Sequence, residues 1–286
     1  MKLLRYGPRG QEKPGLLDAA GAIRDLSGVV GDLGPGEISP AGLERLAGLD
    51  AASLPEVSGG PRLGLPVAGT AKVLCVGLNY IDHANEVGAS IPKDAIYFQK
   101  PVTALTGPND PIVKPVDSTM LDWEVELVVV MGSKAQYIGE SEVMDHIAGF
   151  ALGNDVSERE FQTRRSGQWT KGKSHDSFAP IGPWLVTKDE IADVQNLDMF
   201  LNVNGERMQT GNTAKMIFSV VEAVAYASRF MTLMPGDVVM TGTPPGVGSA
   251  MKPPRFLDVG DEVHLGIEGL GEARQTVVSW EDRPKD

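Results

Sequence analysis

The run "MLDWEVELVVV", residues 120–130, places two glutamates in an otherwise apolar stretch. In a β-strand, alternate side chains share a face, so Glu124 and Glu126 are expected on the face that Val128 and Val130 continue. Two carboxylates about 7 Å apart along a strand repel each other unless a positive charge lies between them. A solvated face is the commoner reading of Glu-x-Glu, but the valines indicate a strand entering a buried sheet. We therefore interpret the pair as candidate ligands of a hard divalent cation.

A third carboxylate for such a site is found in "FALGNDVSEREFQ", residues 150–162. Asp155 directly follows an apolar, strand-like run, which is a usual place for a site residue, although it could equally cap a helix. Arg159 and Gln162 follow four and seven residues later and share a face if the turn is helical. Either one alone would more commonly belong to a solvated helix face. Together they are candidates for the polar side of a binding site.

A candidate general base lies in "NYIDHANEVG", residues 79–88, which predicts a short helix capped by Asn79. His83 and Glu86 are three positions apart and are therefore neighbours on that helix. A carboxylate beside an imidazole orients the ring and raises its basicity, as in a general base. The alternative is an exposed helix pair. Because glycines flank the segment, we expect that it can move as a lid.

The segment "GQWTKGKS", residues 167–174, has the spacing of a phosphate-binding loop. That loop needs a strand before it and a helix after it, so that backbone N–H groups surround the phosphate. Here a polar stretch precedes the motif, and Pro180 and Pro183 disfavour a following helix. A nucleotide site is therefore not expected. The four histidines are scattered without zinc-like spacing, so no zinc site is expected either.

The amino-acid composition limits which binding partners and which cell compartment are expected. The formal net charge of −12 disfavours nucleic acids and anionic membranes but permits a small acidic substrate, because a few cations can reverse the local field. The single cysteine, Cys75, allows no intrachain disulfide and is expected to be buried in a strand. The N-terminus lacks a signal-peptide pattern, and no apolar run approaches the roughly 18 residues of a membrane helix. We expect a cytoplasmic protein.

The order of predicted elements indicates a β-rich α+β fold. Short strand-like runs alternate with Gly/Pro turns, and Asn204-Gly205 predicts a hairpin. Helices are predicted only for a few segments, chiefly 39–49 and 218–231. No βαβ alternation is present, which argues against Rossmann and TIM architectures. A Gly/Pro-rich connector predicts a small N-terminal domain, residues 1–68, and a catalytic domain, residues 69–286.

Six motifs in a fixed order resemble the fumarylacetoacetate hydrolase family from about residue 71 to the C-terminus. They are "GLNYIDHANE", "AIYFQKP", "LDWEVELVVVMG", "GNDVSEREFQ", "WTKGKSHDSFAPIGPWLVT" and "VVMTGTPPGVG". No single motif would suffice, but the ordered set is specific. The resemblance implies a mixed β-roll, a homodimer and a bound Mg²⁺ or Mn²⁺.

The resemblance also assigns roles to individual residues. It implies metal ligands at Glu124, Glu126 and Asp155; catalytic residues at His83, Glu86 and Lys173; and substrate-binding residues at Arg159, Gln162, Gly242 and Thr243. Two positions depart from the family pattern. His175 stands where the family usually has Phe, and Glu158 stands where it commonly has a small residue.

The activity implied is hydrolysis of the C–C bond of a 2,4-diketo acid through a metal-stabilised pyruvate enolate. His83 with Glu86 would activate the attacking water. The opening 30 residues are similar to a branch that hydrolyses 2,4-diketo-3-deoxy-L-rhamnonate or -L-fuconate to pyruvate and lactate. Alternatives on the same scaffold are an oxaloacetate decarboxylase, a hydroxyheptadienedioate isomerase and a ureidoglycolate lyase. A binding protein without activity is disfavoured, because the full set of ligand and base residues is present.

Overall fold

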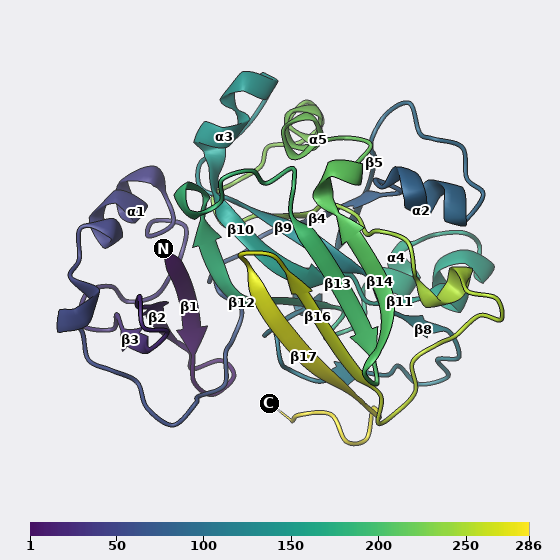
Figure 1. Ribbon diagram of the computed structural model, residues 1–286, viewed down its shortest axis with the longest axis horizontal. Helices are drawn as coiled ribbons and strands as arrows, with labels where there is room; N and C mark the ends of the chain where they lie inside the picture. Colours follow the sequence, from purple (N-terminus) through teal and green to yellow (C-terminus); the bar gives the residue numbers. More distant parts are fainter. Residues whose placement is uncertain (286) are drawn as a thin grey trace.

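Strands dominate the computed structural model, which describes residues 1–285, and every helix in this part of the chain is short (Figure 1). The predicted β-rich α+β class is therefore confirmed. The strand pairs are mainly antiparallel, with parallel pairs at only three places, so neither a Rossmann nor a TIM topology is formed. None of the helices in residues 1–285 has the length and apolarity needed to span a bilayer.

The largest sheet has ten strands and runs through the middle of the molecule. In spatial order its strands are β3 (Ile23–Asp25), β2 (Lys13–Leu17), β1 (Lys2–Tyr6), β12 (Ala179–Thr187), β10 (Ile147–Asn154), β9 (Val125–Met131), β15 (Val238–Met240), β4 (Val73–Gly77) and β5 (Ile96–Lys100), with β6 (Leu105–Thr106) beside β12.

A five-stranded sheet packs against the large one and lies in front of it in Figure 1. Its strands are β14 (Glu206–Asn212), β13 (Asp198–Val203), β16 (Glu262–Ile267), β17 (Gly271–Val278) and β7 (Ile112–Val113). A separate pair joins β8 (Leu121–Asp122) to β11 (Ser157–Glu158). The predicted hairpin is confirmed, because Asn204 and Gly205 link β13 to β14 with φ values of 51° and 80°.

The helices surround the sheets. They are α1 (Pro40–Ala47), α2 (Ile81–Glu86), α3 (Val143–His146), α4 (Thr170–Lys173) and α5 (Val220–Ala227), with a π-helical turn at Glu160–Arg164 and 3-10 turns at Ala51–Ser53, Val102–Ala104, Glu140–Glu142, Lys188–Glu190, Thr213–Lys215 and Gly248–Ala250. The predicted helices near residues 39–49 and 218–231 are confirmed in shorter form. Ser39 and Ser219 cap them by accepting hydrogen bonds from backbone N–H groups.

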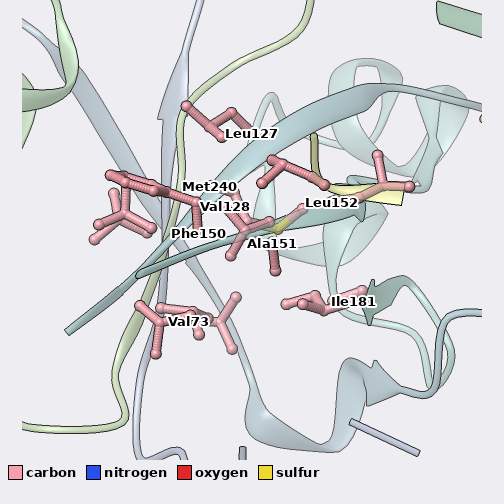
Figure 2. Close-up of a cluster of buried hydrophobic side chains, with 14 of the residues drawn as sticks. Val73, Leu127, Val128, Phe150, Ala151, Leu152, Ile181 and Met240 are labelled. Carbon is pink, nitrogen blue, oxygen red and sulfur yellow. The ribbon is translucent and has the colours of Figure 1, made fainter. Parts of the chain in front are cut away.

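The core lies where β9, β10 and β12 cross the centre of the molecule. Figure 2 shows Val128, Phe150, Leu152 and Ile181 packed together from these three strands. Both faces of β9 are buried, which explains why its sequence is apolar without alternation. Burial of each such side chain contributes on the order of 1.5–3 kcal/mol. Cys75 is also buried, as predicted, and burial raises the pKa of its thiol.

One strand prediction is wrong in detail. Residues 120–130 do not form one strand, because β8 ends at Asp122 and β9 begins at Val125. In the gap, side chains replace the strand partner: the Glu124 N–H donates to Asn154 Oδ1 (3.0 Å) and the Val125 N–H to Gln209 Oε1 (3.0 Å). Glu124 therefore lies before the strand rather than on its face.

The first 68 residues extend the large sheet, because β1 pairs with β12 through Lys2–Val186 and Leu3–Leu185 (Figure 1). Arg62 adds a polar link across the proposed boundary. Its Nε and Nη2 donate to the Asp110 carboxylate at 2.7 and 2.6 Å. Division into domains at residue 68 stays a prediction.

The link between Arg62 and Asp110 predicts a pH-dependent part of the stability. Burial raises the pKa of Asp110, but the Arg62 guanidinium and the donors from Thr106 and Gly107 outweigh it and lower the pKa from 3.8 to about 2. A carboxylate with a depressed folded-state pKa stabilises the protein above its unfolded-state pKa and loses this contribution as the pH falls. Asp110→Asn should lower the free energy of unfolding at pH 5 by about 1–2 kcal/mol, after allowance for solvent screening.

The difference between wild type and Asp110→Asn should shrink by roughly half at pH 3, where the wild-type carboxylate has lost part of its advantage. Urea unfolding at pH 5, 4 and 3 measures it. A difference that stays constant over this range would show that Asp110 does not contribute through its charge.

Candidate active site

Three carboxylates meet where β9 begins and β10 ends. The two strands are antiparallel neighbours, with Glu126 opposite Gly153, so the residue after β10 lies beside the residue before β9. The Asp155 N–H donates to the Glu124 carbonyl oxygen at 2.9 Å and fixes this arrangement. One oxygen from each of Glu124, Glu126 and Asp155 lies within 4.8 Å of the others, and all three residues are buried. The structure thus brings together the three predicted ligands.

Two buried lysines hold Asp155 from different sides. Lys173 Nζ lies 2.7 Å from Asp155 Oδ2 and 2.9 Å from Glu124 Oε2, so it bridges two carboxylates. Lys100 Nζ donates to Asp155 Oδ1 and, at 3.1 Å, to the Val156 carbonyl. Lys100 was not predicted as a site residue. Its only signal in the sequence is a lysine ending the predicted strand "AIYFQK".

Arg159 connects the cluster to its surroundings. Its Nη2 donates to Glu124 Oε1 at 2.6 Å, its Nε to Asp122 Oδ2 at 2.8 Å, and its Nη1 to Gln162 Oε1 at 3.1 Å. The predicted proximity of Arg159 and Gln162 is therefore observed. Asp155, in contrast, caps no helix, and Arg159 stands immediately before the π-helical turn Glu160–Arg164.

Asp122 is a second residue that sequence reasoning missed. It is fully buried and also accepts hydrogen bonds from the N–H groups of Gly248 (2.7 Å) and Ser249 (3.0 Å). It therefore joins the segment after β15 to Arg159.

The charges of the cluster fit an additional cation. Among the described residues it contains the carboxylates of Asp122, Glu124, Glu126 and Asp155, and the cations of Lys100, Arg159 and Lys173. Burial raises the pKa of Glu124, but Lys173 and Arg159 outweigh it and hold that pKa well below the usual range. Within residues 1–285 Glu126 forms no ion pair with a lysine or arginine; it accepts the Gly242 N–H at 2.8 Å. Burial, together with the charges of Asp155 and Glu124, raises its pKa.

The four carboxylates exceed the three cations by one charge, and three of the carboxylates converge, which is the donor set that a hard divalent cation requires. The residues present therefore fit the metal that the resemblance implies.

The predicted pair of a histidine base and its carboxylate, His83 and Glu86, lies on α2. His83 Nδ1 is 2.9 Å from Glu86 Oε2, and Glu86 Oε1 accepts the Gly246 N–H at 2.8 Å. With Nδ1 engaged by the carboxylate, Nε2 is the ring nitrogen left to act as a base. The prediction that Asn79 caps this helix is wrong, since Tyr80 is the N-cap residue and its side chain forms no capping hydrogen bond.

The Asn79 side chain instead forms hydrogen bonds with two other segments. Its amide donates to the carbonyl oxygens of Phe218 (3.0 Å) and Thr241 (2.8 Å), and it accepts the Phe218 N–H at 2.8 Å. It therefore anchors the start of α2 to the end of β15.

Nearly all of the predicted site residues border one cavity of about 370 Å³. Its lining includes His83, Glu124, Glu126, Asp155, Arg159, Gln162, Lys173, Gly242 and Thr243, with Met120, Arg164, Trp169, Phe98, Val87, Val247 and Ser249 among the others. Glu86 and Lys100 are not part of the lining and act through His83 and Asp155. The cavity thus combines an ionic cluster with largely apolar walls.

Gly242 and Thr243 line this cavity, but their polar groups have partners in the protein. The Gly242 N–H donates to Glu126, and the Thr243 hydroxyl donates to the Val125 carbonyl at 2.9 Å. Gly242 has a φ of 96°, and a Cβ there would lie 2.8 Å from Asn79 Cβ, so only glycine fits. Binding of a substrate carboxylate by these two residues stays a prediction.

His175 lies outside the cavity lining. Its ring packs between Phe161 and Phe178, with centroid distances of 5.6 and 5.1 Å. Burial lowers its pKa. The family departure at this position therefore concerns packing behind the site.

Fold and site together define an enzyme in which a buried carboxylate cluster and a histidine paired with a glutamate meet at one cavity. The pattern of the fumarylacetoacetate (FAA) hydrolase C-terminal domain matches residues 72–278. The chain belongs to the fumarylacetoacetate hydrolase family, as the motifs predict.

Relatives that match along nearly their whole length support the assignment to this family. A Sphingomonas sp. (strain SKA58) protein named 2,4-didehydro-3-deoxy-L-rhamnonate hydrolase is 53% identical over 281 residues, which cover 98% of this chain and 97% of the relative. The solved fumarylacetoacetate hydrolase from Exiguobacterium antarcticum is 33% identical, with a TM-score of 0.85 and coverage of 98% and 99%. A 2-hydroxyhepta-2,4-diene-1,7-dioate isomerase from Mycobacterium marinum is 31% identical, with a TM-score of 0.75 and coverage of 98% and 99%.

Proposed function

We propose that this chain is a Mg²⁺- or Mn²⁺-dependent hydrolase that cleaves the C–C bond of a 2,4-diketo acid. The favoured substrate is 2,4-diketo-3-deoxy-L-rhamnonate, or the related L-fuconate derivative, which would give pyruvate and lactate. The Sphingomonas relative, named for such a hydrolase and similar along almost the whole chain, supports this choice.

One observation carries the proposal: a histidine base, a carboxylate cluster suited to a cation and a lysine border the same cavity. A hydrolase needs the base for water, whereas a decarboxylase or isomerase needs no activated water. The His83–Glu86 pair therefore favours hydrolysis.

Glu124, Glu126 and Asp155 would hold the metal, which would supply a Lewis acid for the keto oxygen and carboxylate of the substrate. Lys173 is a buried cation that lines the cavity, as Arg159 is, and it would neutralise negative charge on the substrate. Gln162 accepts from Arg159 through Oε1, which leaves its NH₂ group to donate to a substrate oxygen.

The water step can be written for the residues of α2. His83 Nε2 takes a proton from water while the water oxygen bonds to C4 of the diketo acid. The C3–C4 bond then breaks, and its electron pair passes to C3, which takes up the proton that His83 removed from the water. The three-carbon fragment leaves as pyruvate, and C4 leaves as the carboxylic acid of the second product. Glu86 keeps Nδ1 occupied, so that Nε2 stays directed to this role.

A substrate panel tests the proposal. Purified, EDTA-treated protein is mixed with acetylpyruvate, a 2,4-diketo-3-deoxy sugar acid, oxaloacetate or ureidoglycolate, with and without Mg²⁺ or Mn²⁺, and products are identified by NMR. We expect metal-dependent release of pyruvate plus a second acid from the diketo acids. Carbon dioxide and pyruvate from oxaloacetate alone would instead indicate a decarboxylase.

The similarity to a solved diene-dioate isomerase keeps isomerisation as a second candidate, with lyase activity on ureidoglycolate as a third. A shift of a double bond without release of a second acid would identify the isomerase. The homodimer and the cytoplasmic location implied above stay predictions. Light scattering of the purified protein tests the first.

A further inference from the structure

A fully buried carboxylate that the proposed chemistry does not use lies behind the cavity. Glu158 has no exposed surface and belongs to β11, next to Arg159. Its carboxylate hydrogen-bonds to Ser118, Met120 and Glu160, none of which belongs to the carboxylate cluster.

The Glu158 carboxylate accepts hydrogen bonds from three neutral donors, two in the segment before β8 and one directly after β11. Its Oε2 accepts the Ser118 hydroxyl and, at 3.0 Å, the Met120 N–H; its Oε1 accepts the Glu160 N–H at 2.9 Å. Within residues 1–285 no lysine or arginine forms an ion pair with it. A buried carboxylate without a cation is costly unless such donors compensate it, so these bonds are specific requirements of the site.

Met120 is the point where this network reaches the cavity. Met120 is one of the residues that line the cavity, and both of its backbone groups are fixed, the N–H by Glu158 and the carbonyl by the Arg159 N–H at 2.9 Å. Glu124 follows Met120 by four positions, at most about 13 Å along an extended chain. Just before it, Val116 and Asp117 form an exposed turn, with a φ of 62° at Asp117. Without Glu158, the Met120 N–H would lose its partner, and no bond to this N–H would separate the cavity wall from the exposed turn.

We propose that Glu158 is a positioning residue that fixes Met120 against the tail of the substrate and so sets which tails the enzyme accepts. The inference rests on the proposed function, in which the carboxylate and keto groups lie at the ionic cluster and the tail extends away from it. Glu158 itself touches no substrate.

The test compares two diketo acids that differ only in their tails: acetylpyruvate, with a methyl group, and 2,4-diketo-3-deoxy-L-rhamnonate, with a 1-hydroxyethyl group. Glu158→Ala should lower kcat/KM for the longer tail by about tenfold more than for acetylpyruvate, a usual magnitude for a lost pocket contact. Ser118→Ala removes only one donor, folds with less disturbance and should shift the same ratio by about threefold. Glu160→Ala, which removes a neighbouring carboxylate bound to Thr119 and Arg165, is the matched control and should leave the ratio unchanged.

Two further measurements separate positioning from a general loss of structure. Hydrogen exchange should show a loss of protection at the Met120 amide in Glu158→Ala but not in Glu160→Ala. In a Met120→Ala background, Glu158→Ala should cause no further change in the ratio, because both act through the same side chain.

Equal losses on both substrates, or a Met120 amide that stays protected in Glu158→Ala, would overturn the inference. A wild-type enzyme that hydrolyses neither diketo acid would overturn the proposed function, and the tail selectivity with it. Activity on both acids with an unchanged ratio would overturn the selectivity alone.

Discussion

Glu126→Gln should abolish metal binding and lower hydrolysis by on the order of 10³-fold, while the metal-free protein becomes no less stable than wild type. Metal binding is lost while the stability of the metal-free protein is not, and both effects have the same cause. Glu126 is buried beside two other carboxylates, and among the described residues no lysine or arginine forms an ion pair with it. A neutral amide removes this like-charge repulsion and can still accept the Gly242 N–H, but it no longer supplies the charge that a metal requires.

Calorimetry with Mg²⁺ or Mn²⁺ measures the affinity, and thermal unfolding with and without metal measures the stability. Metal should raise the melting temperature of wild type and not that of the variant, because only a state that binds is stabilised by ligand. Glu206→Gln, an exposed carboxylate paired with Arg255, is the control for loss of one negative charge. Unchanged metal affinity in Glu126→Gln would show that the ligand assignment is wrong.

The apolar sequence around Glu124 and Glu126 correctly predicts that both are buried, because the valines of β9 leave the strand no solvated face. The break before β9 was not predictable in the same way. It depends on Asn154 and Gln209, which are 30 and 84 residues away from the N–H groups they occupy. Local patterns contain no information on which remote amide will replace a strand partner.

The same reason explains the two missed site residues. Asp122 and Lys100 look unremarkable in the sequence, as an aspartate before tryptophan and a lysine before proline. Their roles come from partners 37 and 55 residues away, Arg159 and Asp155. Asn79 shows the opposite error: its position at the start of α2 predicts a cap, but tertiary contacts to Phe218 and Thr241 take its amide instead. Motif order and burial were thus accessible from the sequence, whereas the network that orients the ligands was not.

His83→Ala should lower kcat for hydrolysis by about 10²–10⁴-fold and leave the metal affinity unchanged. His83 lines the cavity and is hydrogen-bonded to Glu86 but is not one of the three candidate ligands, so its loss removes the base without removing a ligand. Glu86→Gln keeps an acceptor for His83 Nδ1 but not the negative charge. The rate should therefore fall less in Glu86→Gln than in His83→Ala.

Stopped assays with the diketo acid, together with metal calorimetry, measure the two effects separately. Free imidazole should restore part of the rate in His83→Ala and none in Glu126→Gln, since an added base can replace a missing base in the cavity but does not restore a missing metal ligand. Two results would contradict the role of His83: full hydrolysis by His83→Ala, or a loss of metal affinity equal to that of Glu126→Gln. The first would move the proton transfer to another group in the cavity, and the second would mean that α2 holds the carboxylate cluster together rather than activating water.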